Sequence, residues 1–161
     1  MGLDMYLTAE KDFHSTLAFG DEEVKNKRKL FSKLLSGAGL TARDIDGEFP
    51  YATISFKVGY WRKANAIHAW FVKNCQNGVD NCKSHDVSKE KLIALKTACI
   101  TVLSDNSKAT ELLPPQSGFF FGSTEVDEWY ISDLKNTVEI INRCFNERLN
   151  QNWHFKYQSS W

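Results

Sequence analysis

The sequence has no excess of charge of either sign and no long apolar run. Its 161 residues include 20 Lys and Arg and 20 Asp and Glu, so the formal net charge is zero. A chain without a positive field has no general attraction for long nucleic acids or anionic membrane surfaces. No stretch approaches the roughly 18 apolar residues of a membrane span, and residues 1–12 show no signal-peptide pattern. We therefore expect a cytoplasmic protein whose partners include neither a membrane nor a long nucleic acid.

Two further kinds of site are also missing from the sequence. Neither GxGxxG nor GxxxxGK[ST] occurs, so we expect no glycine-rich phosphate loop. Cys75, Cys82 and His85 do not have the spacing of a structural zinc site and lack a fourth ligand. Cys99 and Cys144 lie on apolar helical stripes and are expected to be buried. We therefore expect reduced thiols, no metal and no cofactor.

The hydrophobic pattern alternates between strand and helix periods. Two-residue alternation predicts three strands, at residues 3–8, 51–58 and 153–158. Helical spacing predicts four helices, at residues 21–36, 62–76, 88–103 and 127–150. In the middle strand, the expected covered face carries Ala52, Ile54, Phe56 and Val58. These elements predict a single α+β domain over residues 1–161, with a small, mostly antiparallel sheet of about three strands covered on one face by about four helices.

Five segments of the chain, in order, carry a family resemblance. They are MGLDMYL (1–7), VGYWRKANAIHAWF (58–71), LPPQSGFFFGS (113–123), DEWY (127–130) and YQSSW (157–161). Together they resemble an uncharacterised family of small bacteriophage and prophage proteins, over nearly the whole chain. The resemblance implies a setting in the cytoplasm of a bacterial host. Small accessory phage proteins in that setting commonly act in host takeover or counter-defence, several of them by binding or degrading nucleotide signals of bacterial immunity. No catalytic residues come with the resemblance.

The junction between the second strand and the helix after it combines rings and cations. Its residues are Tyr60, Trp61, Arg62 and Lys63. A helix N-terminus offers backbone N–H groups and a dipole that favour an anion. An arginine can hold phosphate or carboxylate through two parallel hydrogen bonds, and a ring can stack on a base. The alternative is that Trp61 belongs to the core and Arg62 pairs with Asp127 or Glu128.

Asn65 and His68 follow Arg62 at three-residue spacing on the same helix. This spacing places the three side chains along one polar side, where they can converge on a ligand. Histidine titrates near neutral pH, which suits proton transfer if the ring faces a cleft. The alternative for His68 is a partly buried hydrogen-bonding residue, because no nucleophile or second base is fixed beside it.

The loop that follows Pro114 and Pro115 carries three rings between two glycines. Its candidate site residues are Phe119, Phe120, Phe121, Gly122 and Ser123. Three consecutive rings cannot all point one way, so at least one is expected to be exposed or to lie at an interface. The loop is either a wall on which a ligand stacks, or a core plug or a contact in a homo-oligomer.

The start of the last helix is acidic and aromatic. Asp127, Glu128, Tyr130 and Asp133 occur there, and helix capping alone explains much of the pattern. If these groups face Arg62 and Lys63, their carboxylates can receive a ribose hydroxyl or an amino group while the cations hold phosphate. Paired carboxylates also suit acid–base or metal chemistry.

The hypothesis that combines these features is a non-enzymatic phage protein that binds and sequesters a nucleotide-like small molecule, a host immune signal. Its pocket is expected to form from residues 60–68, 119–123 and 127–130. One alternative is a hydrolase or phosphodiesterase that degrades such a nucleotide, with His68 as acid–base and Asp127 or Glu128 assisting. Another is a protein-interaction module that inhibits a host factor through the phenylalanine loop.

Overall fold

The computed structural model describes residues 2–14, 22–41, 43–45, 51–118, 122–146 and 152–161. The chain divides into two compact units. The first unit comprises residues 1–9 and 56–161, and the second comprises residues 10–55, which are inserted between those two segments in the sequence. The expectation of a single domain stays a prediction.

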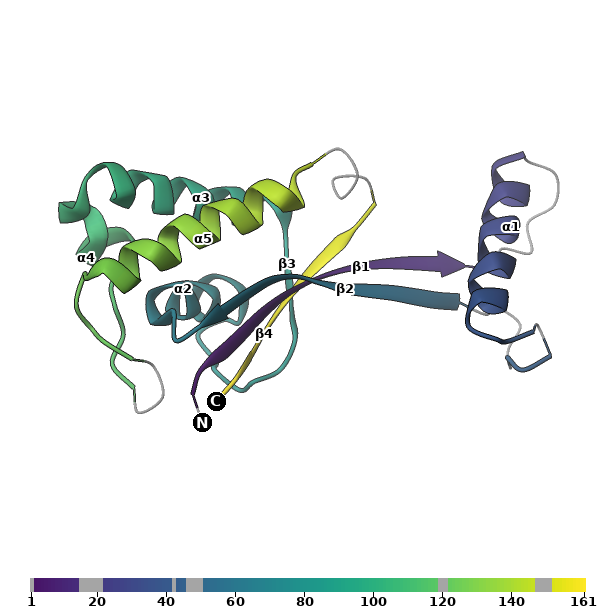
Figure 1. Ribbon diagram of the computed structural model, residues 1–161, viewed down its shortest axis with the longest axis horizontal. Coiled ribbons are helices and arrows are strands. Elements are labelled where there is room, and N and C mark those ends of the chain that lie inside the picture. Colours follow the sequence, from purple (N-terminus) through teal and green to yellow (C-terminus); the bar gives the residue numbers. More distant parts are fainter. Residues whose placement is uncertain (1, 15–21, 42, 46–50, 119–121, 147–151) are drawn as a thin grey trace. The chain divides into compact units, whose positions relative to one another are not determined.

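Four strands form one sheet in the order β2-β1-β4-β3. They are β1 (Asp4–His14), β2 (Tyr51–Arg62), β3 (His85–Val87) and β4 (His154–Ser160). β3 pairs antiparallel with β4, with His85 opposite Tyr157. β1 begins beside the end of β4 (Figure 1), so these neighbouring strands also run in opposite directions. The predicted α+β class with an antiparallel sheet is therefore confirmed, and the three-residue β3 is the strand that the sequence pattern missed.

All four predicted helices are present. α1 (Glu22–Gly37) belongs to the second unit, and the first unit contains α2 (Asn65–Cys75), α3 (Lys89–Ser104) and α5 (Glu128–Cys144). The short η1 (Asn106–Lys108) and α4 (Ala109–Leu112) were not predicted. α3 packs against α5 (Figure 1). The side chains of Ser88 and Asp127 cap α3 and α5, because each accepts a hydrogen bond from a backbone N–H of the first turn.

The core of the first unit lies between one face of the sheet and the helices. β1 alternates as predicted, because Leu3, Met5, Leu7 and Ala9 are all fully buried. The rings of Phe71 on α2 and Tyr157 on β4 stack with their centroids 3.9 Å apart. Other buried core residues on the helices are Ile67, Leu92, Leu95, Leu134 and Ile141.

β2 departs from the predicted alternation. Ala52 and Ile54 are half-buried as expected, but Phe56 is 56% exposed, and the buried positions further along are Gly59 and Trp61. Val58 is also half-buried and packs against the core, so Phe56 is the one of the four predicted positions that is exposed. The prediction that Phe56 lies on the covered face is therefore wrong.

The second unit has little buried apolar surface among its described residues. Phe31 on α1 is buried, while Leu34 and Leu35 are half-buried and Leu30 is exposed. The half-buried and buried side chains of α1 thus lie in its second half. In the same unit, the Thr53 hydroxyl donates a hydrogen bond of 2.6 Å to Asp12 across the two strands.

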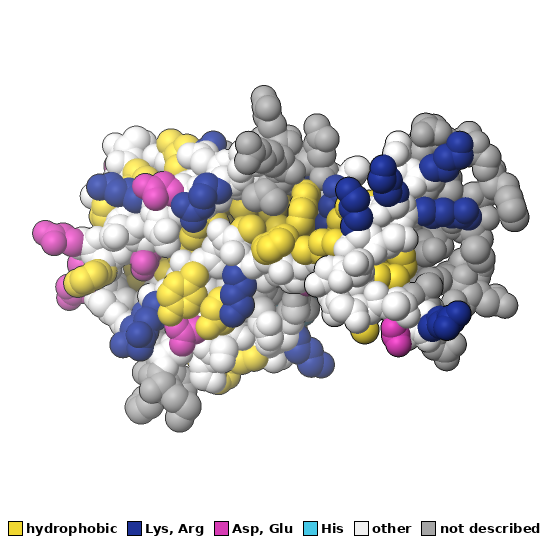
Figure 2. Space-filling model, turned by 45° about the vertical axis from the view of Figure 1, so that its right-hand side comes forward, with side chains coloured by type: hydrophobic (Ala, Val, Ile, Leu, Met, Phe, Trp, Pro, Cys, Tyr) yellow, Lys and Arg dark blue, Asp and Glu magenta, His cyan; other side chains and the backbone are white. Residues whose placement is uncertain are grey.

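Charged side chains are spread over the surface. Figure 2 shows one face, on which Lys and Arg side chains occur singly or in small groups, with acidic and apolar side chains among them. None of the helices in the described ranges combines the length and the apolar composition that a bilayer crossing requires.

The close packing of β2 against α5 gives a first testable prediction. A Cβ added at Gly59 would lie 2.7 Å from Cγ2 of Ile140 and 3.1 Å from Cβ of Leu7. We expect Gly59→Ala to lower the free energy of unfolding by about 1–3 kcal/mol in urea titrations, because both neighbours belong to a packed core.

The control is Gly37→Ala at the end of α1, where an added Cβ meets no atom within 4 Å. This substitution should leave the free energy of unfolding unchanged or raise it slightly. Equal effects of the two substitutions would contradict the tight contact at Gly59.

Candidate functional site

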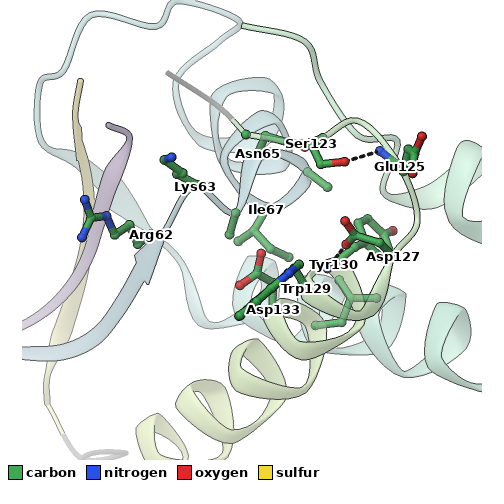
Figure 3. Close-up of a pocket in the computed structure, with 14 residues that line it drawn as sticks. Arg62, Lys63, Asn65, Ile67, Ser123, Glu125, Asp127, Trp129, Tyr130 and Asp133 are labelled. Carbon is green, nitrogen blue, oxygen red and sulfur yellow. Dashed lines mark hydrogen bonds between the residues drawn. The ribbon is translucent and has the colours of Figure 1, made fainter. Parts of the chain in front are cut away.

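A cavity of about 370 Å³ in the first unit is bounded by the start of α2 and the start of α5 (Figure 3). It brings together seven residues that the sequence predicted for a ligand site: Arg62, Lys63, Asn65, Gly122, Ser123, Asp127 and Tyr130. Basic residues come from the end of β2 and the turn after it, and acidic residues come from α5 and the segment before it. The cavity therefore has a basic side and an acidic side.

The basic side is built by a two-residue turn. Lys63 has a φ of 59°, in the left-handed region, and Ala64 follows with φ −74° and ψ 70°. The N–H of Lys63 donates to the carbonyl oxygen of Leu3 at 2.8 Å, and the N–H of Asn65 donates to the carbonyl oxygen of Lys63, also at 2.8 Å. These bonds turn the chain from β2 directly into α2 and hold Lys63 at the cavity.

Lys63 occupies a backbone conformation that glycine or asparagine adopts more readily. A left-handed residue with a Cβ costs about 1–2 kcal/mol. The stem of Lys63 lies between two glycines, because added Cβ atoms would come within 3.3 Å of its Cε at Gly2 and 3.4 Å of its Cβ at Gly122. The fold thus leaves room for a long cationic side chain at a position where glycine would cost less.

The first turn of α2 presents free donors beside Lys63. The first helical bond runs from the N–H of His68 to the carbonyl oxygen of Ala64. The N–H groups of Ala66 and Ile67, which both line the cavity, have no acceptor within the described part of the chain. The N-cap residue, Ala64, forms no side-chain capping hydrogen bond, and the first turn of α2 contains no acidic residue. The helix end therefore adds positive potential to the basic side.

Arg62 lies at the edge of the cavity and is exposed. In Figure 3 its guanidinium group points away from the carboxylates of Asp127 and Asp133. Within the described ranges, neither Arg62 nor Lys63 forms an ion pair with an acidic side chain. The alternative that Arg62 pairs with Asp127 or Glu128 is therefore wrong.

On the acidic side, Asp127 and Asp133 have different surroundings. One oxygen of Asp127 caps α5 by accepting the N–H of Tyr130 at 2.9 Å. The carboxylate of Asp133 is half-buried and accepts no hydrogen bond from any residue that the structure describes. Burial, together with the negative charge of Asp127, raises the pKa of Asp133 to about 6. Asp133 is thus a partly desolvated carboxylate with no donor among the described residues.

The loop from Leu113 to Ser123 is tied to both helices. The Asn65 side chain accepts the N–H of Gln116 at 3.0 Å and donates to the carbonyl oxygen of Ser123 at 2.7 Å, so one amide holds both ends of this loop. The hydroxyl of Tyr130 donates to the carbonyl oxygen of Leu113 at 2.8 Å. Burial raises the pKa of that hydroxyl to about 12. Asn65 and Tyr130 thus shape the cavity while their polar atoms are engaged in holding the loop.

Four of the predicted site residues lie outside this cavity. Tyr60 is exposed on β2, where its hydroxyl donates to Asp4, and Glu128 is exposed on α5 without lining the cavity. Trp61 is buried, and its indole N–H donates to the hydroxyl of Thr137 at 2.8 Å, so the core alternative describes it correctly. Phe119, Phe120 and Phe121 lie outside the described residues.

His68, the fourth, is buried and its ring is held on both sides. Nδ1 is 2.7 Å from the Tyr157 hydroxyl, and Nε2 is 2.9 Å from a carboxylate oxygen of Asp80. The ring lines another depression of the surface, together with Asp80 and Lys73. Arg62, Asn65 and His68 therefore do not converge on one ligand, and His68 does not share a cavity with Asp127 or Glu128.

Trp129 and Glu125 also line the cavity and were not predicted for the site, and Asp133 was predicted only as part of an acidic group. Trp129 lines the cavity although its side chain is 80% exposed. Trp129 and Asp133 are four residues apart on α5, so they lie on one helix face. Once Asp127 is recognised as the N-cap of α5, this four-residue spacing places Trp129 and Asp133 on one face near the helix start. It was the sequence signal for both residues.

Comparison of the chain with protein-family models, curated proteins and solved structures gives no match. Among the described residues, no group of three or more His, Cys, Asp or Glu side chains is arranged to hold a metal ion. The interpretation of the cavity therefore depends on its own residues.

The left-handed conformation of Lys63 gives a second prediction. We expect Lys63→Gly to raise the free energy of unfolding by up to about 1 kcal/mol in urea titrations, because glycine adopts this conformation without a Cβ clash. Lys63→Ala keeps the Cβ and should give no such gain. As a control, Lys73→Gly within α2 should lower the free energy of unfolding by about 1 kcal/mol. A loss of similar size in Lys63→Gly would contradict the cost assigned to this turn.

Asp133 gives a third prediction, on pH. Its folded pKa lies above the unfolded value, so the folded state binds more protons between about pH 4 and pH 6, and stability falls as pH rises through this window. We expect Asp133→Asn to flatten that decline and to raise the free energy of unfolding at pH 7.5 by about 1 kcal/mol, since solvent screening reduces the full effect of the shift. Urea titrations at pH 4, 5, 6 and 7.5 measure both effects. If the stability of the wild type and of Asp133→Asn depended on pH in the same way, the pKa of Asp133 would not be raised in the folded state.

Proposed function

We propose that the protein binds a nucleotide-like small molecule in the cavity between α2 and α5 and retains it without chemical change. One observation supports this most strongly. Lys63 and Asp133 face the same cavity with opposite charges, and among the described residues neither is neutralised by the other or by another side chain. A ligand that carries an anion at one end and hydrogen-bond donors at the other complements both sides.

The basic side suits a phosphate group. The ammonium group of Lys63 and the N–H groups of Ala66 and Ile67 supply charge-assisted and helix N-terminal hydrogen bonds, the combination that favours phosphate. Arg62, at the edge, adds positive potential there. The opposite side suits neutral or positively charged donors, such as ribose hydroxyls or amino groups, because Asp127 and Asp133 supply acceptor oxygens.

The size of the cavity restricts the ligand. Small-molecule sites typically enclose roughly 300–1,000 Å³. A volume of about 370 Å³ is near the lower end of that range. It suits a single nucleotide, or one half of a dinucleotide whose other half lies outside.

The proposed role is sequestration. His68, the histidine for which catalysis was considered, belongs to another depression and is held by Tyr157 and Asp80. The resemblance to small phage proteins supplies the biological setting of this proposal, in which the bound nucleotide is a signal of the host's immune system.

Isothermal titration calorimetry tests the proposal. The wild-type protein is titrated with nucleoside monophosphates, cyclic dinucleotides and ADP-ribose, and with any ligand found the titration is repeated on Lys63→Gly and on Lys135→Ala. Lys63→Gly should lower affinity about tenfold or more, as expected for one lost charge-assisted hydrogen bond to phosphate. Lys135 is exposed on α5 and does not line the cavity, so its substitution should leave affinity unchanged.

Two results would overturn the proposal. One is a folded wild-type sample that binds none of these compounds. The other is a ligand whose affinity is the same in Lys63→Gly as in the wild type. Chromatography of the recovered ligand after long incubation separates binding from turnover, and a chemically altered ligand would replace sequestration by an enzymatic role.

A further inference from the structure

The residues on the acidic side of the cavity favour one particular arrangement of hydrogen-bond donors. We infer that it recognises a guanine base, with the carboxylate of Asp133 accepting two adjacent N–H groups of the ring edge and Trp129 stacking on the ring face. This inference rests on the proposed nucleotide site and names the base that the site takes.

The carboxylate of Asp133 is a half-buried acceptor of the cavity with no donor among the described residues. It lies on α5, six residues or nearly two turns beyond the capping Asp127. Its carboxylate oxygens accept no hydrogen bond from the residues described, although the backbone carbonyl oxygen of the same residue accepts the Thr137 hydroxyl at 2.7 Å. An ionised carboxylate has two oxygens and about four acceptor positions, and it donates nothing. A partly desolvated carboxylate in this state is stabilised by a ligand that brings two donors side by side.

Trp129 supplies a flat apolar surface next to this acceptor. Its side chain lines the cavity and is 80% exposed, so the rim is apolar at this point. A large exposed ring gains free energy when another flat ring covers it, and base stacking on aromatic side chains is a common form of nucleotide recognition. The i, i+4 spacing from Trp129 to Asp133 places the stacking ring and the acceptor on one face of α5.

Only guanine among the common bases presents two adjacent donors on its Watson–Crick edge. These are the N1–H and the 2-amino group. Adenine and cytosine each place an acceptor nitrogen next to their amino group, and that nitrogen would face the negative carboxylate. Uracil has one N–H between two carbonyl oxygens. A carboxylate therefore favours guanine and disfavours the others, and a good bidentate contact of this kind gives about 10- to 100-fold discrimination.

The same pair of donors occurs in one other common planar group, the guanidinium of arginine. Free arginine also carries a carboxylate, which would suit the side of the cavity formed by Lys63. The guanine nucleotide is favoured because its rigid ring suits the acidic side of the cavity and its doubly charged phosphate suits the basic side. L-Arginine is included in the test so that the two sources of this chemistry are distinguished.

The experiment is a calorimetric titration of the wild-type protein at pH 7.5 with GMP, IMP, AMP and L-arginine. IMP differs from GMP only by the absence of the 2-amino group, so the comparison isolates the second donor. We expect GMP to bind at least tenfold more tightly than IMP or AMP. In Asp133→Asn this preference should fall to less than threefold, while Glu139→Gln, an exposed carboxylate elsewhere on α5, should keep it.

Trp129→Ala gives an independent readout. Stacking of the base on the indole quenches or shifts tryptophan fluorescence, and the protein has five tryptophans, so the difference between wild type and Trp129→Ala isolates this ring. We expect GMP to change the fluorescence of the wild type and to change that of Trp129→Ala far less. Thermal melting confirms that each variant is folded.

The possible outcomes distinguish a failure of the guanine assignment from a failure of the proposed nucleotide site. If IMP or AMP binds as tightly as GMP, the guanine assignment fails while the nucleotide site stands. If L-arginine binds and GMP does not, both the assignment and the nucleotide proposal fail. If GMP binds with its preference unchanged in Asp133→Asn, Asp133 is not the residue that recognises the base.

Discussion

The short turn between β2 and α2 is the constraint on which the site depends. Trp61 anchors the end of β2 to α5 through the buried hydroxyl of Thr137, and α2 begins only four residues later. The chain reverses within that distance because Lys63 takes a left-handed conformation and Ala64 makes a tight turn. As a result the uncapped first turn of α2 faces the first turns of α5. The cavity lies where these two helix starts approach each other.

Two residues of this cavity work against the stability of the fold. Lys63 has a Cβ where glycine would cost less, and Asp133 has a carboxylate that is partly removed from water and accepts no hydrogen bond from the described residues. Natural proteins concentrate such costs at functional sites, where a ligand later satisfies the strained groups. That the two costs carry opposite charges and face one cavity is the strongest physical reason to regard the cavity as a binding site.

The helix starts could be predicted from the sequence because their signals are local. Arg62 and Lys63 before α2, and Asp127 and Tyr130 at the start of α5, were identified from capping and charge patterns of a few residues. The burial of Trp61 and His68 could not be predicted in the same way, because their hydrogen-bond partners, Thr137 and Tyr157, are 76 and 89 residues away. β3 was missed because three residues carry too little periodicity, and its pairing with β4 is a long-range contact. Phe56 was misplaced because two-residue alternation does not show which positions of an edge strand the rest of the fold covers.

The most direct test of this account is a ¹³C NMR titration of the Asp133 carboxyl group in the ligand-free protein. The account requires that no basic group of the cavity neutralises Asp133, so it predicts a pKa of about 6 for this carboxyl, raised by burial and by the charge of Asp127. A measured pKa at or below the ordinary aspartate value of about 3.9 would show that a cation already pairs with Asp133. In that case Asp133 would already be paired and could not serve as the acceptor for a ligand, and the account would be contradicted.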